Sequence, residues 1–271
     1  MKKFRRAAAA AGVILILLMY ILTFVFAMMK SEAAQALFRG ALGCTILVPV
    51  FLYLIRMVAE VVRPSRSAAV DTVIFDLGNV LIDFDWQGYA ASLGYSPELI
   101  ARLKENVILS ETWNRFDYGN EPYEDVVEAL AAETPDCADE IRALVNTIDR
   151  ACSPFWYTKD WITALKRRGY RVLFLSNWSE EICRRLTENG VFDFISLMDG
   201  GVWSFKEHVI KPDPKIFDIL AKRYDLVPGR CVFLDDNKKN IEAARAYGFA
   251  GIVFTGYPDA EETLSRIGIR W

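Results

Sequence analysis

Residues 73–80 read VIFDLGNV, and this stretch decides the fold. Three apolar residues that favour strands lead directly into the carboxylate of Asp76, and Gly78 follows two positions later. A buried strand that ends in this way holds a charged oxygen at the edge of a sheet, where open α/β sheets bind their ligands. An aspartate in this position can also cap a turn or a helix. Its meaning therefore depends on the residues that follow it along the chain.

Strand and helix patterns alternate after this stretch. Besides residues 72–75, short apolar runs predict strands at residues 171–175, 194–197, 231–234 and 251–254. Segments with helical spacing lie between them, at residues 161–168, 180–188, 214–224 and 240–247. Such alternation is typical of βαβ units, so we expect an α/β fold whose core is a Rossmann-like parallel sheet.

One long interval breaks this alternation. Residues 88–155 contain no apparent strand, and helical signals occur within them at 97–107, 122–132 and 141–148. We therefore expect an all-helical cap at 88–155, inserted into a core made of residues 71–87 and 156–271. Such a cap would lie above the carboxyl end of the first strand.

The amino-terminal part of the chain has the character of a membrane anchor. Residues 11–29 carry no charge and match the roughly 20 apolar residues that a helix needs to cross a bilayer. A second apolar run is free of charge over residues 40–55, about 24 Å as a helix, and it extends further if Arg56 snorkels. We expect a transmembrane helical hairpin at residues 1–63, followed by a linker at 64–70.

Basic residues precede the first apolar run and follow the second, so the positive-inside rule places both ends in the cytoplasm. We therefore expect a membrane location, with lipid around residues 11–62 and the catalytic domain facing the cytoplasm. A cleaved signal peptide, ending near residues 34–36, is an alternative, although its apolar core would exceed the usual 7–15 residues. The second run can also be read as an interfacial or buried helix.

Composition excludes several classes of function. The net charge of −3 argues against a nucleic-acid groove. His208 is the only histidine, which excludes histidine triads and multi-histidine metal sites. The five cysteines form no CxxC pair, which favours reduced thiols over a disulfide framework or a zinc site.

Three further motifs follow or flank the predicted strands. Ser176 and Asn177 follow one strand, and a hydroxyl with the next backbone N–H can hold phosphate oxygens there. Lys211 stands in a Lys-Pro-Asp-Pro sequence, and lysine binds phosphate as a point charge. Asp235 and Asp236 follow another strand, and paired carboxylates suit Mg²⁺. Each motif taken alone is also compatible with an ordinary helix cap.

Together with Asp76, these motifs resemble, in the same order, those of the haloacid dehalogenase superfamily, in its branch of phosphatases with a helical cap. The resemblance covers roughly residues 70–269. It implies that Asp76 is a nucleophile that forms an aspartyl-phosphate, and that Lys211 is a second catalytic residue that balances charge. It also implies that Ser176, Asn177 and Lys211 bind the phosphate of a small phosphorylated substrate.

The same resemblance implies a Mg²⁺ cofactor. Its ligands would be the carboxylates of Asp76, Asp235 and Asp236, together with the backbone carbonyl of Gly78. Asn240 is expected to order the loop after the acidic pair, and the neighbouring Lys206 and Lys215 are expected to be solvated.

The chain departs from the family pattern at Gly78, where most of these phosphatases carry a second aspartate as general acid and base. The DLGNV sequence resembles sugar-1-phosphate phosphatases, whose better leaving group needs less acid assistance. Alternatively, Asp83 or Asp85 supplies the proton from a flap. As a third possibility, the chain is an anchored binding module without catalysis.

Haloacid dehalogenases proper also carry glycine at this position, so a dehalogenase is another alternative. The intact pair of Asp235 and Asp236 favours phosphoryl transfer instead, since the dehalogenases that this chain resembles need no Mg²⁺ and carry serine-type residues at these positions.

In the cap, residues 113–119 resemble a recurring segment of this branch. Its aromatic residues Trp113, Phe116 and Tyr118 are expected to pack more often than to contact substrate. Trp178 is the better candidate for a wall of the cleft, and His208 is expected at the surface.

Overall fold

The computed structural model describes residues 21, 24–25, 27–28 and 70–271. The chain divides into two compact units, Met1–Arg66 and Ser67–Trp271. The expected hairpin at 1–63 and linker at 64–70 lie almost wholly outside the described residues. Within the described part of the chain, no helix combines the length and the apolar character that a membrane span requires.

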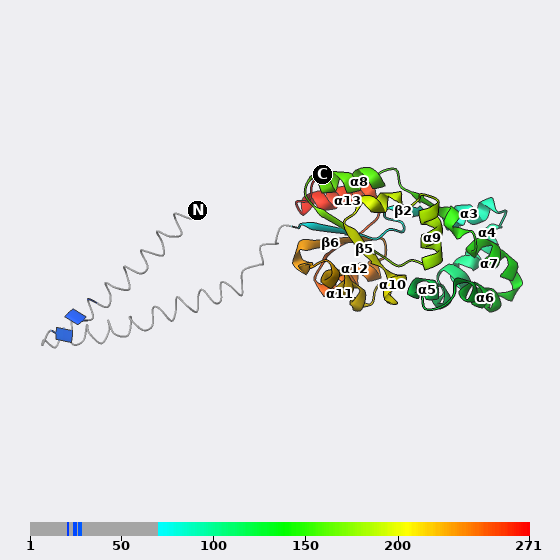
Figure 1. Cartoon of the computed structure of the whole chain (residues 1–271), viewed down its shortest axis with the longest axis horizontal. Coiled ribbons are helices and arrows are strands. Elements are labelled where there is room, and N and C mark those ends of the chain that lie inside the picture. The colour runs from blue at the N-terminus through cyan, green and yellow to red at the C-terminus, as the bar shows by residue number, and fades with distance from the viewer. Residues whose placement is uncertain (1–20, 22–23, 26, 29–69) are drawn as a thin grey trace. The chain divides into compact units, whose positions relative to one another are not determined.

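The second unit is built on a parallel sheet of five strands, which confirms the predicted α/β fold (Figure 1). The strands are, in the order in which they lie side by side, β5 (Gly200–Trp203), β4 (Arg171–Ser176), β1 (Thr72–Phe75), β6 (Cys231–Asp235) and β7 (Ala250–Val253). On β1, Phe75 is level with Phe174 of β4 and Leu234 of β6. The carboxyl ends of these three strands therefore meet at one edge of the sheet.

Successive side chains of β1 point to opposite faces of the sheet, as strand geometry requires. Val73 and Phe75 belong to one hydrophobic core, and Ile74 belongs to the other. Helices α8 (Thr158–Arg167) and α13 (Tyr257–Arg266) cover the first face. The second face is covered by α11 (Pro214–Arg223) and α12 (Lys238–Tyr247). Both faces of β1 are thus buried, which explains its unbroken apolar sequence.

Trp161 on α8 is the largest side chain that is fully buried, and its ring meets Phe75 edge-to-face at a centroid distance of 4.7 Å. We expect Trp161→Ala to lower the free energy of unfolding by about 3–5 kcal/mol, because it leaves a cavity beneath β1. Trp156→Ala is the matched control, since Trp156 is 81% exposed and its loss should cost about 1 kcal/mol or less. Denaturant unfolding of the full-length chain measures both, and equal losses would contradict this account.

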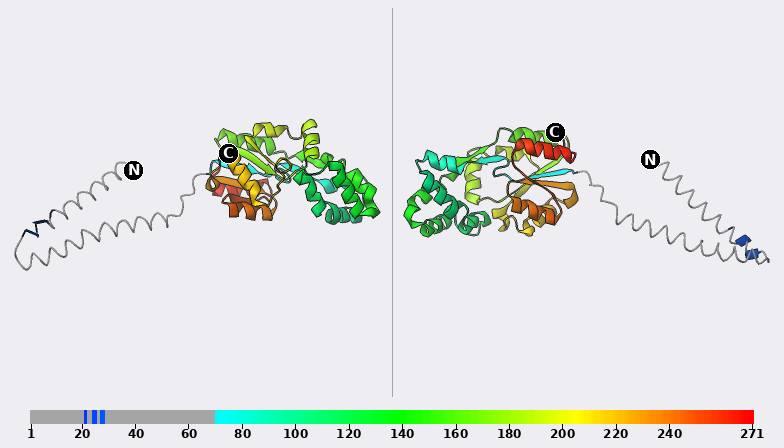
Figure 2. Two further views of the ribbon diagram at one scale, coloured as in Figure 1. Left: turned by 60° about the horizontal axis from the view of Figure 1, so that its bottom comes forward. Right: turned by 180° about the vertical axis from the view of Figure 1, so that it is seen from behind.

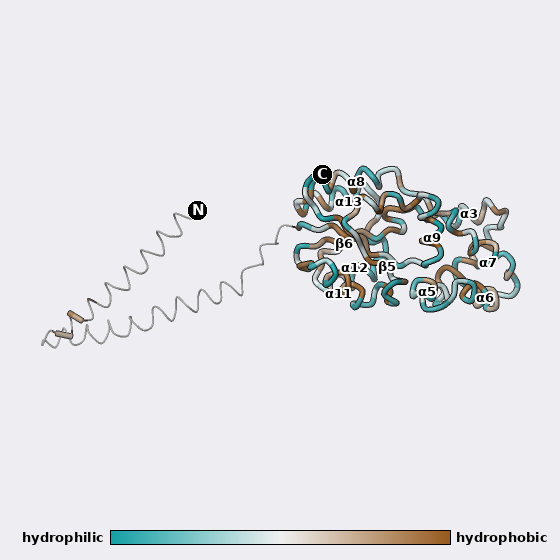
Figure 3. Tube along the Cα trace, in the orientation of Figure 1, coloured by the Kyte–Doolittle hydropathy of each residue, from teal (hydrophilic) through white to brown (hydrophobic). Residues whose placement is uncertain are grey.

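Helices predominate in the interval between β2 (Ile82–Phe84) and β3 (Cys152–Pro154), and they gather as a lobe beside the sheet (Figure 2). Hydrophobic stretches run along the strands and through this lobe (Figure 3). The cap helices are α3 (Trp86–Ser92), α4 (Pro97–Leu103), a π-helix (Lys104–Ile108), α5 (Glu111–Tyr118), α6 (Tyr123–Glu133) and α7 (Ala138–Val145).

The expectation of no strand within 88–155 is wrong at one point. Strand β3 (Cys152–Pro154) pairs antiparallel with β2 (Ile82–Phe84), and the two join the cap to the core as a short ribbon. Three residues that include a proline give no readable alternation, so the sequence offers no signal for β3.

The strand predicted at 194–197 is also wrong. These residues lie in a 3₁₀-helix (Asp193–Leu197) that buries Phe194, and the strand β5 follows it. A Cβ on Gly201 would lie 2.3 Å from Cδ1 of Phe174, so β5 needs glycine where it packs against that ring. Glycines are uncommon in strands, which hid the true position of β5 from the sequence pattern.

Candidate active site

Asp76 lies directly after β1, with its carboxylate held by several donors. Oδ1 accepts hydrogen bonds from the Leu77 N–H (2.7 Å) and from the Ser176 hydroxyl (2.6 Å), and Lys211 Nζ lies 2.9 Å away. These donors fix the carboxylate and leave Oδ2 without a hydrogen bond from residues 70–271. Burial raises the pKa of Asp76, and Lys211 opposes this shift.

Lys211 is a buried cation between two carboxylates. Its Nζ lies 2.7 Å from Asp235 Oδ2 in addition to its contact with Asp76. Although burial disfavours the ammonium form, Asp235 and Asp76 raise the pKa of Lys211. Asn177 fixes the backbone of Lys211, because its Oδ1 accepts from the Lys211 N–H (2.8 Å) and its Nδ2 donates to the Lys211 carbonyl (3.0 Å). The lysine is thereby aimed at the end of β1.

Asp235 is the last residue of β6, and Asp236 follows it. Asp235 is fully buried and accepts hydrogen bonds from the Asn237 N–H (2.8 Å) and from Asn240 Nδ2 (3.0 Å), which confirms the ordering role expected of Asn240. Asp236 accepts from Asn79 Nδ2 at 3.0 Å. Asp76, Asp235 and Asp236 each offer a carboxylate oxygen, and these oxygens lie within 4.8 Å of one another.

This donor set fits a divalent cation. Three carboxylates face one ammonium group, so the cluster carries a charge of −2 when all four groups are ionised. Uncompensated charge is costly away from water, and Mg²⁺ would balance it with the oxygen ligands that it prefers. Asp76, Asp235 and Asp236 would hold the ion. The expected contribution of the Gly78 carbonyl stays a prediction, although Gly78 lines the same pocket.

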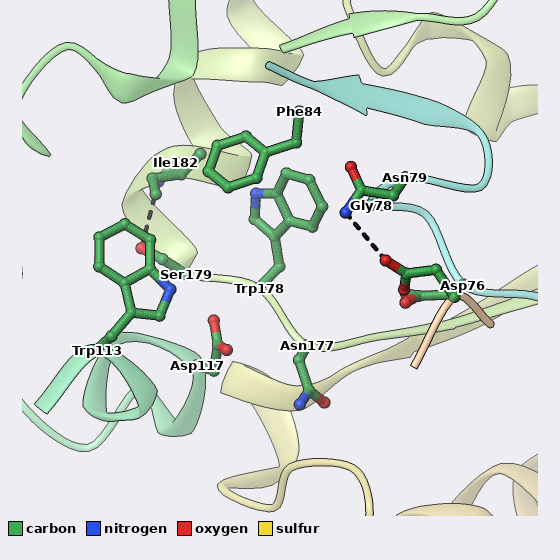
Figure 4. A pocket seen from close by; sticks show the side chains of 11 residues that line it. Asp76, Gly78, Asn79, Phe84, Trp113, Asp117, Asn177, Trp178, Ser179 and Ile182 are labelled. Carbon is green, nitrogen blue, oxygen red and sulfur yellow. Dashed lines mark hydrogen bonds between the residues drawn. The ribbon is translucent and has the colours of Figure 1, made fainter. Parts of the chain in front are cut away.

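A pocket opens in front of Asp76, between the sheet edge and the cap (Figure 4). The aromatic and apolar part of its wall consists of Phe84, Trp113, Trp178 and Ile182, and the polar part is formed by Asn79, Asp117, Asn177, Ser179 and Asp236 together with Asp76. The expectation for Trp178 is confirmed, since it forms part of this wall. Its indole Nε1 is buried and has no hydrogen-bond partner in the described part of the chain.

The structure gives a physical reason for glycine at position 78. A Cβ on Gly78 would lie 3.3 Å from Cζ3 of Trp178, so a larger residue would press against the indole ring. Neither alternative proton donor lines the pocket. Asp83 is paired with Ser153 in the β2–β3 ribbon, and Asp85 caps α3 by accepting from the Gly88 N–H at 2.9 Å.

The other residues considered in the sequence fall into two groups: those that lie at the active site and those that do not line its pocket. Ser176 and Asn177 lie at the site, but their side chains bind Asp76 and Lys211, so their role as phosphate ligands stays a prediction. Phe116 packs in the cap core as expected. His208, Lys206 and Lys215 are exposed and do not line the pocket, and His208 Nδ1 lies 2.8 Å from the Tyr118 carbonyl oxygen. The expectation that Tyr118 packs is wrong, since its side chain is exposed.

Sequence reasoning missed Ser179, Ile182 and Asp117 among the residues of the pocket, and Asp117 on α5 is the only one of these three with an ionisable side chain. Its signal was its spacing, because Asp117 lies four residues after Trp113 and therefore on the same face of the helix. The cysteines at 137, 152, 183 and 231 are free buried thiols, as expected for reduced residues.

Comparisons with known proteins agree with this geometry. A family model described as haloacid dehalogenase-like hydrolase matches residues 70–248. The sesquiterpene phosphatase astK of Aspergillus oryzae is 27% identical over 184 residues, which are 67% of this chain and 88% of that protein. The (S)-2-haloacid dehalogenase 1 of a Pseudomonas species is 25% identical over 187 residues, 65% of this chain and 80% of that protein.

Among solved structures, the fold matches a magnesium complex of the HAD family enzyme bt-2542 from Bacteroides thetaiotaomicron. The TM-score is 0.55 at 19% identity, and the match covers 69% of this chain and 93% of that one. The family model spans more than half of the 271 residues, and its range contains Asp76, Lys211 and Asp235. With its Rossmann-like sheet and this cluster at the sheet edge, the chain belongs to the haloacid dehalogenase-like hydrolases.

Proposed function

We propose that this protein is a magnesium-dependent phosphatase that hydrolyses a small phosphorylated substrate through an aspartyl-phosphate on Asp76. The observation that carries the proposal is the buried Lys211 ammonium, which lies 2.9 Å from Asp76 and 2.7 Å from Asp235. A cation fixed beside a nucleophilic carboxylate suits the charge of a phosphoryl group. The acidic pair beside it favours this reaction over carbon–halogen cleavage.

The contacts of Asp76 suggest how the first step proceeds. Since Oδ1 is held by Leu77, Ser176 and Lys211, Oδ2 is the oxygen available to attack phosphorus. The bond between phosphorus and the leaving oxygen then breaks, and Lys211 balances the charge of the transferred group. Bound Mg²⁺ would stabilise the negative charge on the phosphoryl oxygens. Water completes the reaction by displacing Asp76 from phosphorus.

The pocket walls support a substrate whose organic part is apolar. Phe84, Trp113 and Trp178 surround the space in front of Asp76. The similarity to a sesquiterpene phosphatase supports the same class, and the DLGNV sequence supports sugar-1-phosphates as the second class. We further propose that residues 11–62 contact membrane lipid as a helical hairpin and place the catalytic unit at the cytoplasmic face, where apolar phosphate esters collect.

A phosphate-release screen of the full-length protein tests this function. Terpenyl phosphates and sugar-1-phosphates should release phosphate with Mg²⁺ and should not do so after chelation. Tight binding of these esters without turnover would favour the non-catalytic binding module. Halide release from 2-haloacids that persists with a chelator would favour the dehalogenase.

Mg²⁺ is also expected to stabilise the fold, which gives a readout other than activity. At a concentration of about 100 times its dissociation constant, Mg²⁺ should add about 2.7 kcal/mol to the free energy of unfolding. Asp236→Asn should lose most of this gain because it removes one anionic ligand from the cluster. Asp160→Asn, an exposed change on α8, should keep it. Thermal unfolding with and without Mg²⁺ distinguishes the two variants, and equal gains would exclude Asp236 as a ligand.

A further inference from the structure

The proposed reaction lacks a proton donor for the leaving oxygen, because Gly78 has no side chain and Asp83 and Asp85 do not line the pocket. The cap contributes one carboxylate to this pocket. Asp117 lines it together with Asp76 and Asn177, and it projects from α5 into the space between Trp113 and Asn177 (Figure 4). No residue between 70 and 271 donates a hydrogen bond to it or pairs with it. Its carboxylate is therefore available to a bound molecule.

The neighbours of Asp117 hold it in this position. Phe116 is buried and its ring lies 4.6 Å from that of Tyr123, while the Tyr118 carbonyl meets His208. At Gly119, which ends α5 with a φ of 61°, a Cβ would lie 2.8 Å from the backbone oxygen of Phe205. The end of α5 is thus packed closely against α10 (Ser204–Glu207), a few residues before Lys211. Asp117 is fixed over the site by packing on both sides.

We propose that Asp117 is the general acid and base of this active site, supplied by the cap in place of the aspartate that the core lacks. The inference rests on the proposed phosphatase function. In the first step, Asp76 forms a bond to phosphorus, the bond from phosphorus to the leaving oxygen breaks, and the Asp117 proton moves to that oxygen to give an alcohol. In the second step, the Asp117 carboxylate takes a proton from water as the water oxygen displaces Asp76, which releases phosphate and restores the acid.

The surroundings of Asp117 suit this role. Burial raises the pKa of Asp117 to about 7, and Lys211 opposes the shift. A pKa near the working pH serves both halves of an acid–base cycle. The titratable groups that line the same space are Asp76, Asp236 and Lys211, and the Cys183 thiol of α9 (Glu180–Glu188) is near enough to interact with Asp117.

The test compares Asp117→Asn with wild type on two phosphate esters. With an alkyl phosphate, whose leaving oxygen needs a proton, kcat/KM should fall roughly 10²–10⁴-fold. With an aryl phosphate, whose phenolate leaves unassisted, kcat/KM should change little. The phospho-enzyme should then accumulate, so a burst of phenolate precedes slow turnover. The wild-type loss of kcat/KM for the alkyl ester above about pH 7 should be absent in the variant.

Asp125→Asn, an exposed change on the neighbouring α6, is the matched control and should behave as wild type. Folding of Asp117→Asn is checked by thermal unfolding. Because the pKa of Asp117 is raised from 3.8 to about 7 on folding, its contribution to wild-type stability falls as the pH rises from about 4 to about 7, and the neutral asparagine avoids this loss.

Equal losses of kcat/KM on both esters, or no loss on either, would overturn the role of Asp117. Failure of the phosphatase proposal is separate. It would show as no Mg²⁺-dependent phosphate release by the wild type from either ester, or, for the covalent mechanism, as phosphate release that survives Asp76→Asn, whatever Asp117→Asn does.

Discussion

Asp76→Asn is expected to reduce phosphate release roughly 10⁴-fold or more, as loss of a covalent nucleophile does in other enzymes. Asparagine keeps the size of the side chain and an oxygen for the Leu77 and Ser176 donors, so the strand end should stay intact. The amide cannot displace a leaving group from phosphorus. Steady-state phosphate release measures the loss, and acid quenching during turnover should trap phosphate on wild type and not on the variant.

Asp160→Asn on α8 is the control for general effects of an aspartate change, and it should keep full activity. Undiminished phosphate release by Asp76→Asn would disprove the covalent mechanism. Trapped phosphate on that variant would show that another residue is the nucleophile.

Lys211→Met is expected to lower the free energy of unfolding by about 3–5 kcal/mol and to remove most activity. Methionine fills similar space, but Asp76 and Asp235 then lose the cation that lies within 3 Å of both. A buried carboxylate without its partner is strongly destabilising. Urea unfolding at neutral pH without Mg²⁺ measures the stability loss, and phosphate release measures activity.

Two comparison variants separate the causes. Lys215→Met changes an exposed lysine four residues away and should alter stability by about 0.5 kcal/mol or less. Adding Asp235→Asn to Lys211→Met removes one of the stranded charges, so the double variant should regain stability without regaining activity. A Lys211→Met protein as stable as wild type would show that the buried ion pairs do not hold this edge of the sheet together.

The sequence predicted the sheet and the residues at its edge because one rule connects them. Asp76, Ser176 and Asp235 each come at or directly after the end of an apolar run, and parallel strands bring such ends together. Lys211 lies outside any strand, and only its Lys-Pro-Asp-Pro motif identified it as a residue of the site. Its exact contacts depend on Asn177, which the sequence suggested for phosphate and the structure places against the lysine backbone.

Features that depend on packing between distant segments escaped sequence reasoning. Strand β5 carries two glycines because Tyr224 occupies the space beside Gly200 and Phe174 the space beside Gly201, and no local pattern records that. The apolar run at 194–197 was too short to distinguish a strand from a buried turn of helix. Asp117 reaches the site only because α5 packs over the sheet edge. The membrane hairpin at 1–63 stays a prediction from composition.

The β2–β3 ribbon places the entry and the exit of the cap side by side, with Ile82 opposite Pro154. Trp113 and Asp117 therefore lie in the cap segment between these strands, while Asp76, Lys211 and Asp235 lie in the core, and both parts belong to the compact unit Ser67–Trp271. If α5 separates from α10, the pocket wall and the proposed acid depart together, but the nucleophile and its cation stay in place. Hydrolysis of the phospho-enzyme would then depend on whether the cap is in place, since a phospho-enzyme whose cap is displaced lacks the proposed base that activates water.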